Sequence, residues 1–290
     1  MTATVGTGLG KVILLGEHAV VYGHPALAGA LALGVRVRVE PAPQPRVVVP
    51  AWGLAVDDGA AVAAIAAIAA ALGRTGSFAV HADATVPSRA GLGSSAALCV
   101  AVARALGAAD DAATEAAAQA GEQVFHGNPS GIDVALATRG GLGLFSRGSG
   151  FTPLALPSFA LVIGLSGEPR DTAARVADVA RQRTSRPAET DRLLGELGAL
   201  AVAGAGAHDA TGLGPLLDRA HELLAQLGLT TPTLDRLCAL ARAAGAHGAK
   251  LTGAGGGGAV LALAPGREEA IAAAWRADGF TAFIVDVGAA

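Results

Sequence analysis

The sequence predicts an α+β protein of two domains, and three observations carry this prediction. The chain has 290 residues, which allows one large domain or two ordinary ones. Hydrophobic residues make up 52% of it, ample for a core, and strand-like and helix-like segments alternate along its length. Pro153 and Pro157 form the clearest interruption. We therefore expect domains over residues 1–155 and 156–290.

In the first domain, apolar or alternating runs bounded by glycine or proline predict strands, and longer alanine-rich runs predict helices. Val35, Val37 and Val39 alternate with arginines, for example, so one face of that strand meets solvent. The strands are expected at Lys11–Leu15, Gly34–Val39, Val47–Val49, Phe78–Val86 and Gly140–Phe145. The helices are expected at Ala60–Leu72, Leu98–Leu106 and Ala112–Phe125, and Ala26–Ala32 is interpreted as a helical turn or buried segment.

The second domain has a helix-rich middle and closes with a strand–helix–strand unit. Its strands are expected at Phe159–Leu165, Ala259–Leu263 and Ala282–Val287. Its helices are expected at Thr172–Arg183, Glu189–Ala203, Gly214–Leu227, Thr233–Ala244 and Glu268–Asp278.

Composition and charge argue against several classes of function. The formal net charge is −3 and only 3% of the residues are aromatic, so the chain lacks the basic, stacking surface of a nucleic-acid-binding protein. The most hydrophobic run, Ala60–Leu72, is shorter than the roughly 20 residues that a membrane-spanning helix needs. Cys99 and Cys238 lie in apolar segments without metal-binding spacing. We therefore expect a cytoplasmic protein with reduced thiols that binds neither nucleic acid nor membranes.

A glycine-rich turn precedes the helix expected at Leu98–Leu106. Gly91 and Gly93 let the backbone approach a ligand closely, and the following helix directs unpaired N–H groups at the loop, which suits a phosphate. Ser94 and Ser95 add hydroxyl groups that could ligate magnesium. No lysine follows the glycines as a P-loop requires. The run also matches the dinucleotide fingerprint G-x-G-x-x-A, although the chain leaves no room for the second strand of that site.

Two further segments point to a binding or catalytic site. Glu17 and His18 follow an apolar strand that begins with Lys11, and ionisable groups in such a run are costly to bury without a partner. Five of the six residues in Gly253–Gly258 are glycine, which costs backbone entropy and is typical of backbone that passes very close to another group. We expect both segments to line the site.

Glu122 and Asp133 are joined through the turn-rich segment His126–Ile132. A carboxylate near a helix end and another at a loop end can converge. One can then hold a metal on nucleotide phosphates, while the other accepts a hydroxyl proton or orients the hydroxyl. The two residues are therefore candidates for a phosphate-transfer site.

In chain order, Lys11–Gly23, Pro87–Ala97 and Lys250–Gly258 resemble the three motifs of the GHMP kinase superfamily, which includes galactokinase, homoserine kinase, mevalonate kinase and phosphomevalonate kinase. Gly16–Gly23 and His126–Asp133 are similar to the mevalonate kinase branch. The resemblance implies a ribosomal-protein-S5-like α/β domain and a ferredoxin-like α+β domain, with the site between them. It implies phosphate transfer from ATP, with Mg²⁺, to the 5-hydroxyl of mevalonate, and it leaves a homodimer open.

The resemblance also implies a role for each candidate residue. Asp133 corresponds to the catalytic aspartate and Lys11 to the lysine paired with it. The implied magnesium ligands are Glu122 and a serine of the pair Ser94 and Ser95. The implied substrate-binding residues are Glu17, His18, Thr252 and, for a substrate carboxylate, Arg147. The implied ATP-binding residues are Gly91, Leu92, Gly93, Ser94, Ser95, Ala96, Gly253 and Gly255.

Three alternatives stay open at this point. The first is another kinase of the superfamily, of the phosphomevalonate or homoserine type, because Val134 follows Asp133 where an asparagine is often found. The second is a dinucleotide-dependent oxidoreductase that uses the G-x-G-x-x-A loop. The third, a non-catalytic nucleotide-binding regulator, is disfavoured because Lys11, Glu122 and Asp133 are all present.

Overall fold

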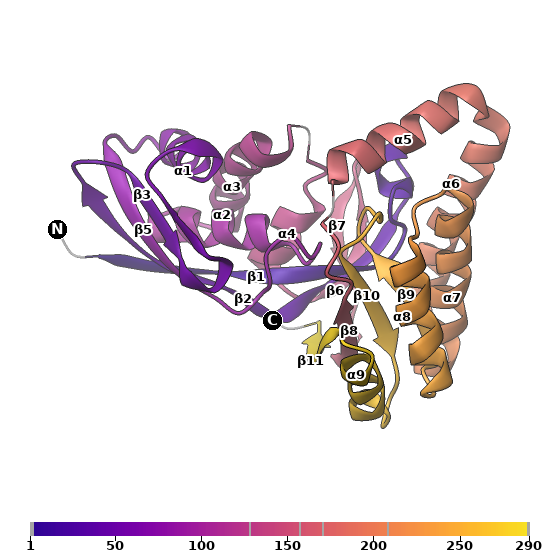
Figure 1. The fold of residues 1–290 in the computed structure, drawn as a ribbon. Coiled ribbons are helices and arrows are strands. Elements are labelled where there is room, and N and C mark those ends of the chain that lie inside the picture. The colour runs from indigo at the N-terminus through magenta and orange to yellow at the C-terminus, as the bar shows by residue number, and fades with distance from the viewer. Residues whose placement is uncertain (1–2, 128, 157, 170, 208, 289–290) are drawn as a thin grey trace.

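The computed structural model describes residues 3–127, 129–156, 158–169, 171–207 and 209–288. Within these ranges, eleven strands form one sheet that runs through both halves of the molecule, and helices pack on it (Figure 1). Asn128, in the segment His126–Asp133, and Pro157, at the expected boundary, lie outside the described residues. No described helix is both long enough and apolar enough to cross a membrane.

Strand β2 connects the two halves of this sheet. It runs over Ala26–Ala42, and β1 (Thr4–Leu15) lies antiparallel along one of its edges. The other edge of β2 pairs in turn with β6 (Leu142–Ser146), β11 (Thr281–Val287) and β5 (Ser77–Ala84). The sheet continues beyond β5 through β3 (Arg46–Val49) and β4 (Leu54–Val56), and β7 (Gly150–Pro153) pairs with β6. Val287 of β11 pairs with Leu31, so the last strand of the chain joins the first half.

Of the two interpretations of Ala26–Ala32, the helical turn is wrong, because this segment is the first part of β2, whereas the buried segment is confirmed for residues 26–31. Residues 26–31 are all buried. A strand that is buried on both faces loses the alternation by which strands are recognised, and alanine itself has low strand propensity. The sequence signal therefore came only from the second part of the strand, where valines alternate with arginines.

Four helices of the first half cover one face of the sheet, and two short 3₁₀ helices lie in its connections (Figure 1). They are α1 (Gly59–Ala71), α2 (Ser94–Ala105), α3 (Asp111–His126), α4 (Ile132–Arg139), η1 (Ala19–Tyr22) and η2 (Pro50–Trp52). Helix α2 lies directly on β1 because that strand presents glycines to it. A Cβ on Gly6 would lie 2.0 Å from the Ala101 carbonyl oxygen, and one on Gly8 would lie 2.3 Å from that of Ala97. These glycines fix the depth at which the N-terminus of α2 sits over the sheet.

The second half extends the sheet beyond β11 in the order β8 (Phe159–Leu165), β10 (Ala259–Leu263) and β9 (Gly248–Thr252). Its helices are α5 (Thr172–Ser185), α6 (Pro187–Ala205), α7 (Ala210–Gln226), α8 (Pro232–Ala243) and α9 (Glu268–Ala277). The expected strand–helix–strand unit at the end of the chain is present as β10, α9 and β11. Strand β9 ends that side of the sheet, and α7 and α8 pack against it (Figure 1). The division at residue 155 falls between β7 and β8 and stays a prediction.

Candidate active site

The expected phosphate loop lies at the N-terminus of α2, which begins at Ser94, four residues earlier than predicted from the sequence. Gly93 is the residue that caps the helix, and its φ of +76° is in the left-handed region that favours glycine. Ser94 and Ser95 are partly exposed, whereas Leu92 and Ala96 are fully buried, with 0% exposure. The side chains of Leu92 and Ala96 therefore pack into the core, and contacts of these two residues with ATP stay predictions. The loop presents N–H groups and two hydroxyl groups at a helix N-terminus, which is an arrangement suited to an anion.

Strand β1 holds this loop from below. The Lys11 backbone N–H donates to the Leu92 carbonyl at 2.9 Å, and the Lys11 side chain donates to the Gly91 carbonyl at 3.3 Å. A Cβ on Gly93 would lie 2.7 Å from Lys11 Cγ. The loop and the lysine are thus packed together as one unit.

We expect Gly93→Ala to disturb both members of this unit. A non-glycine residue at this φ costs about 1–2 kcal/mol, and the new methyl group must displace the Lys11 side chain. The KM for ATP should rise about tenfold or more, and kcat should fall. Gly73→Ala is the matched control, because Gly73 has a φ of +64° and nothing within 4 Å of a Cβ position. Steady-state kinetics of both variants test this prediction. An equal rise in the KM for ATP in the two variants would mean that backbone strain alone is responsible.

The structure brings Lys11 and Asp133 together. Lys11 Nζ lies 3.2 Å from Asp133 Oδ2, and Lys11 is only 4% exposed. Asp133 was expected at the end of a loop, but it occupies the first turn of α4, directly after Gly131, whose φ of +90° turns the chain into the helix. Its side chain is 31% exposed. Asp133 can therefore contact a ligand bound at the phosphate loop through its exposed part, while its buried neighbour Lys11 fixes the position of the carboxylate.

Glu122 lies near the end of α3 and is 2% exposed. Burial, and next the negative charge of Asp133, raise the pKa of the Glu122 carboxyl group to about 7, against the opposing effects of Ser95 and Lys11. The Cys99 thiol lies 3.9 Å from Glu122 Oε1, and burial raises the pKa of that thiol well above its ordinary value, which keeps it protonated as a donor. The negative charge of a buried carboxylate near a second carboxylate is stabilised when a cation binds beside it.

His126 completes this group of side chains. Its Nε2 lies 3.1 Å from Ser95 Oγ and 3.8 Å from Glu122 Oε2. Neither His126 nor Cys99 was expected to contact the site. The contacts of His126 with Ser95 and of Cys99 with Glu122 exist only because α2 packs on α3, whereas the contact of His126 with Glu122 is an i,i+4 pair within α3.

The oxygen donors at this point fit a magnesium ion. Glu122 and the hydroxyl groups of Ser94 and Ser95 are hard oxygen ligands, and Mg²⁺ bound to a nucleotide usually takes only one or two carboxylates from the protein. The described residues contain no group of three or more His, Cys, Asp or Glu side chains that could hold a metal on its own. The donor set thus suits a metal that arrives with phosphate oxygens rather than one enclosed by protein ligands.

Glu17 and His18, expected to contact substrate, lie in a tight turn after β1 and are 1% and 5% exposed. The His18 Nε2–H donates to the Ala254 carbonyl at 2.9 Å, and Glu17 pairs with Lys250, which is fully buried. Lys250 opens the third motif, but the sequence reasoning did not include it among the site residues. The signal that could have found it is a single charged residue in an otherwise apolar strand.

The third motif joins β9 to β10, and its glycines pack mainly against the protein itself. The Thr252 hydroxyl is buried and donates to the Ile13 carbonyl at 2.9 Å. A Cβ on Gly255 would lie 2.3 Å from the Leu229 carbonyl oxygen, and one on Gly257 would lie 2.9 Å from that of Glu168. The backbone does pass very close to other groups, as expected, but these groups are other backbone segments. Contacts of Thr252, Gly253 and Gly255 with a ligand stay predictions.

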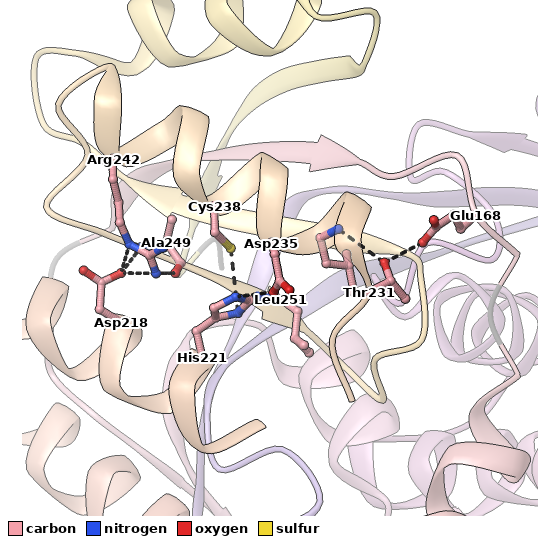
Figure 2. A network of polar contacts seen from close by, with 10 residues as sticks. Glu168, Asp218, His221, Thr231, Asp235, Cys238, Arg242, Ala249 and Leu251 are labelled. Carbon is pink, nitrogen blue, oxygen red and sulfur yellow. Dashed lines mark hydrogen bonds and ion pairs between the residues drawn. The ribbon is translucent and has the colours of Figure 1, made fainter. Parts of the chain in front are cut away.

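Side chains of α7 and α8 bind the outer edge of β9 (Figure 2). Asp218 accepts the Ala249 N–H at 2.9 Å, and Arg242 donates to the Ala249 carbonyl at 3.0 Å. The Leu251 N–H donates to His221 Nδ1 at 3.4 Å. Burial, and next the charge of Arg242, lower the pKa of His221, which keeps Nδ1 an acceptor. Side chains thus bind backbone groups of Ala249 and Leu251 on the edge of β9 that pairs with no other strand among the described residues.

Arg147, expected at a substrate carboxylate, is exposed in the turn between β6 and β7. Among the described residues, no hydrogen bond or ion pair joins it to the residues around Asp133. Its role as a substrate ligand stays a prediction.

Comparison with known proteins identifies a family for both halves of the chain. Residues 59–141 match the family model "GHMP kinases N terminal domain", and residues 197–280 match "GHMP kinases C terminal". A mevalonate kinase of Pyrococcus horikoshii is 35% identical over 93% of this chain and 91% of its own length, and one of Pyrococcus abyssi is 34% identical over 96% and 93%.

Solved structures agree with these matches. The crystal structure of L. major mevalonate kinase in complex with R-mevalonate superposes with a TM-score of 0.87 and 28% identity, covering 100% of this chain and 97% of that one. The Methanococcus jannaschii mevalonate kinase has a TM-score of 0.85 at 22% identity, covering 99% and 98%, which shows the fold. The predicted two-part α+β fold is confirmed. Since each half of the chain matches its own family model and relatives align along nearly its whole length, the chain belongs to the GHMP kinase family, with mevalonate kinases among its relatives.

Proposed function

We propose that this protein is a mevalonate kinase, which transfers the γ-phosphate of ATP to the 5-hydroxyl of mevalonate. The observation that carries the proposal is the Lys11–Asp133 pair, 3.2 Å apart, in contact with the phosphate loop through the Gly91 carbonyl. The relatives named mevalonate kinase, at 31–35% identity over most of the chain, support the choice of acceptor.

In this proposal the chain provides mainly position and charge, as phosphate transfer requires. The N-terminus of α2, with the backbone of Gly91–Ala96 and the hydroxyl groups of Ser94 and Ser95, holds the phosphates. Asp133 accepts the proton of the attacking hydroxyl or orients that hydroxyl, and Lys11 keeps the aspartate in place and adds positive charge beside the transferred group.

Glu122 and a serine of the loop would hold Mg²⁺, which neutralises charge on the phosphate oxygens when it is bound. Cys99 and His126 would support these ligands, because the thiol lies beside the Glu122 carboxylate and the imidazole lies beside both Ser95 and Glu122. Arg147, on the hairpin after α4, is the proposed contact for the mevalonate carboxylate.

A coupled assay of ADP release tests the proposal, with mevalonate, phosphomevalonate, homoserine and galactose as separate acceptors. We expect turnover with mevalonate at least about a hundredfold more efficient than with the others, because a site built to pair with polar groups of one acceptor discriminates strongly against acceptors that lack them. Turnover with another acceptor but not with mevalonate would refute the substrate assignment while leaving a kinase. Binding of NAD(P)H in place of ATP and Mg²⁺ would instead favour the oxidoreductase alternative.

A further inference from the structure

The chain has only two lysines, Lys11 and Lys250, and the other 19 of its 21 basic residues are arginine. Both lysines are buried, with 4% and 0% exposure, and each pairs with a carboxylate, Lys11 with Asp133 and Lys250 with Glu17. Arginine stands at every other basic position, so the two lysines are set apart by their burial and by the compact, strongly hydrated ammonium group that each brings to a carboxylate. Lys11 belongs to the Asp133 pair described above, whereas Lys250 has no role in the proposed mechanism.

Lys250 is one of three buried ties between the first motif and the third. Lys250 Nζ pairs with Glu17 Oε1, the Thr252 hydroxyl donates to the Ile13 carbonyl at 2.9 Å, and His18 Nε2–H donates to the Ala254 carbonyl at 2.9 Å. The paired residues are 233, 239 and 236 positions apart in the chain. The end of β1 and the turn that follows it are therefore attached to β9 and its glycine loop at three points, of which Glu17 and His18 belong to the turn.

The Glu17 carboxylate depends on this lysine for its charge balance. Glu17 Oε2 is buried and accepts no hydrogen bond from the described residues, and Oε1 is bound by Lys250. Lys250 also donates to the Leu251 carbonyl at 2.6 Å, so its ammonium group is held between the two motifs. Burial lowers the pKa of Lys250, and the charge of Glu17 opposes that effect. Removing either partner would leave the other charge buried without compensation.

The turn that Glu17 belongs to needs such an attachment. His18 adopts a φ of +59°, a conformation that is rare for a residue with a side chain and that persists only where its surroundings enforce it. Gly16, with a φ of +94°, packs so closely that a Cβ there would lie 2.5 Å from the Pro25 carbonyl oxygen. The backbone of this turn is thus set by its contacts and not by local preference.

Strand β9, from which Lys250 extends, is bound along both of its edges. Asp218, Arg242 and His221 bind the outer edge of β9 at Ala249 and Leu251, as Figure 2 shows. Lys250 therefore extends from a strand that is held on its outer edge by two helices and on its inner edge by β10.

We propose that Lys250 is a positioning residue for the acceptor side of the site: through Glu17 it holds the turn that carries His18 in the conformation that binds the alcohol substrate. This proposal rests on the proposed function. It also revises the role of Glu17, which acts through its buried contact with Lys250 and not as a direct ligand of the substrate. Nucleotide binding, which uses the loop before α2, should not depend on the pair.

Lysine labelled with ¹³C at Cε gives a direct test, since the protein contains only two such side chains. Lys11→Met assigns the two signals by removing one of them. We expect the Lys250 signal to shift when mevalonate is added and to stay in place when a non-hydrolysable ATP analogue is added with Mg²⁺. A Lys250 signal that does not respond to mevalonate, or that responds only to the nucleotide, would overturn the proposal.

Kinetics of Lys250→Met, Glu17→Gln and the double variant give the second test. Each single change should lower the temperature of thermal unfolding, and the double variant should regain part of it because no unpaired charge remains. If the pair positions the substrate turn, the double variant keeps a KM for mevalonate raised at least tenfold, with the KM for ATP within twofold of the parent. A double variant with the parent's KM for mevalonate would show that the pair contributes to stability alone.

Arg242→Met is the matched control. It removes a cation from the outer edge of the same strand, where Arg242 donates to the Ala249 carbonyl, without touching the first motif. This change should lower thermal stability but leave the ratio of the KM for mevalonate to the KM for ATP unchanged. A raised ratio would mean that any loosening of β9 weakens mevalonate binding. If the parent does not phosphorylate mevalonate, the proposed function fails, and the same ratio is then measured with the alcohol that it does phosphorylate.

Discussion

Asparagine in place of Asp133 should lower kcat by about 10²- to 10⁴-fold, the range that a positioned general base contributes, while ATP binding persists. The amide preserves the shape of the side chain and a contact with Lys11, but it cannot take up the proton of the attacking hydroxyl. Asp133 is suited to this task because it stands in the first turn of α4, partly exposed, with its carboxylate 3.2 Å from Lys11 Nζ. ADP release measures kcat, and titration with a fluorescent ATP analogue measures nucleotide binding.

Asp111→Asn is the control for this experiment. Asp111 also stands in the first turn of a helix, α3, but its side chain is 59% exposed and pairs with Arg104 on the surface. The same chemical change there should leave kcat within about twofold, because exposed ion pairs contribute little. Near-normal kcat in Asp133→Asn would exclude Asp133 from the mechanism. If Lys11 and Asp133 act as a unit, Lys11→Met combined with Asp133→Asn should be little worse than either change alone.

The sequence was sufficient for the parts of the site that local chemistry determines. The glycines before α2 and the acidic residue after Gly131 have recognisable local patterns, and the structure does bring Lys11 and Asp133 into contact. The identity of a helix or strand could also be predicted wherever one face is buried and the other is exposed. The prediction of the element type failed for Ala26–Ala32, where both faces of the strand are buried and the alternating pattern disappears.

The contacts that could not be predicted join segments distant in the chain. Lys250 meets Glu17, and Thr252 meets Ile13, only because β9 ends beside the turn after β1. Likewise, the contact of Cys99 with Glu122 depends on how closely α2 and α3 pack, where a Cβ on Gly121 would lie 2.8 Å from Cys99 Sγ. Spacing along the sequence indicates that such residues belong to a site, but it does not give their partners.

Glu122→Gln should have two opposite effects, a loss of magnesium binding and a gain in the stability of the metal-free protein. Burial, and next Asp133, raise the pKa of Glu122 from 4.5 to about 7 in the folded protein. Between these two values the folded protein holds a proton that the unfolded chain releases, so the stability contributed by this group falls as the pH rises. Above pH 7 the buried charge costs roughly 3 kcal/mol, by the usual conversion of 1.36 kcal/mol per pKa unit. Glutamine removes this cost.

We therefore expect urea unfolding without Mg²⁺ to show Glu122→Gln more stable than the parent at pH 8 by up to roughly 3 kcal/mol, with the difference vanishing below about pH 4, where the carboxyl group is protonated in the folded and the unfolded chain alike. In the ADP-release assay, the Mg²⁺ concentration for half-maximal rate should rise about tenfold or more, because a neutral amide is a weaker ligand than a carboxylate. Glu115→Gln is the control, since Glu115 lies on the same helix but pairs with Arg139 at 2.5 Å. An unchanged magnesium titration in Glu122→Gln would refute its role as a ligand. Equal stability of the variant and the parent at both pH values would refute the raised pKa, and these two outcomes are independent because only the ADP-release assay contains the metal.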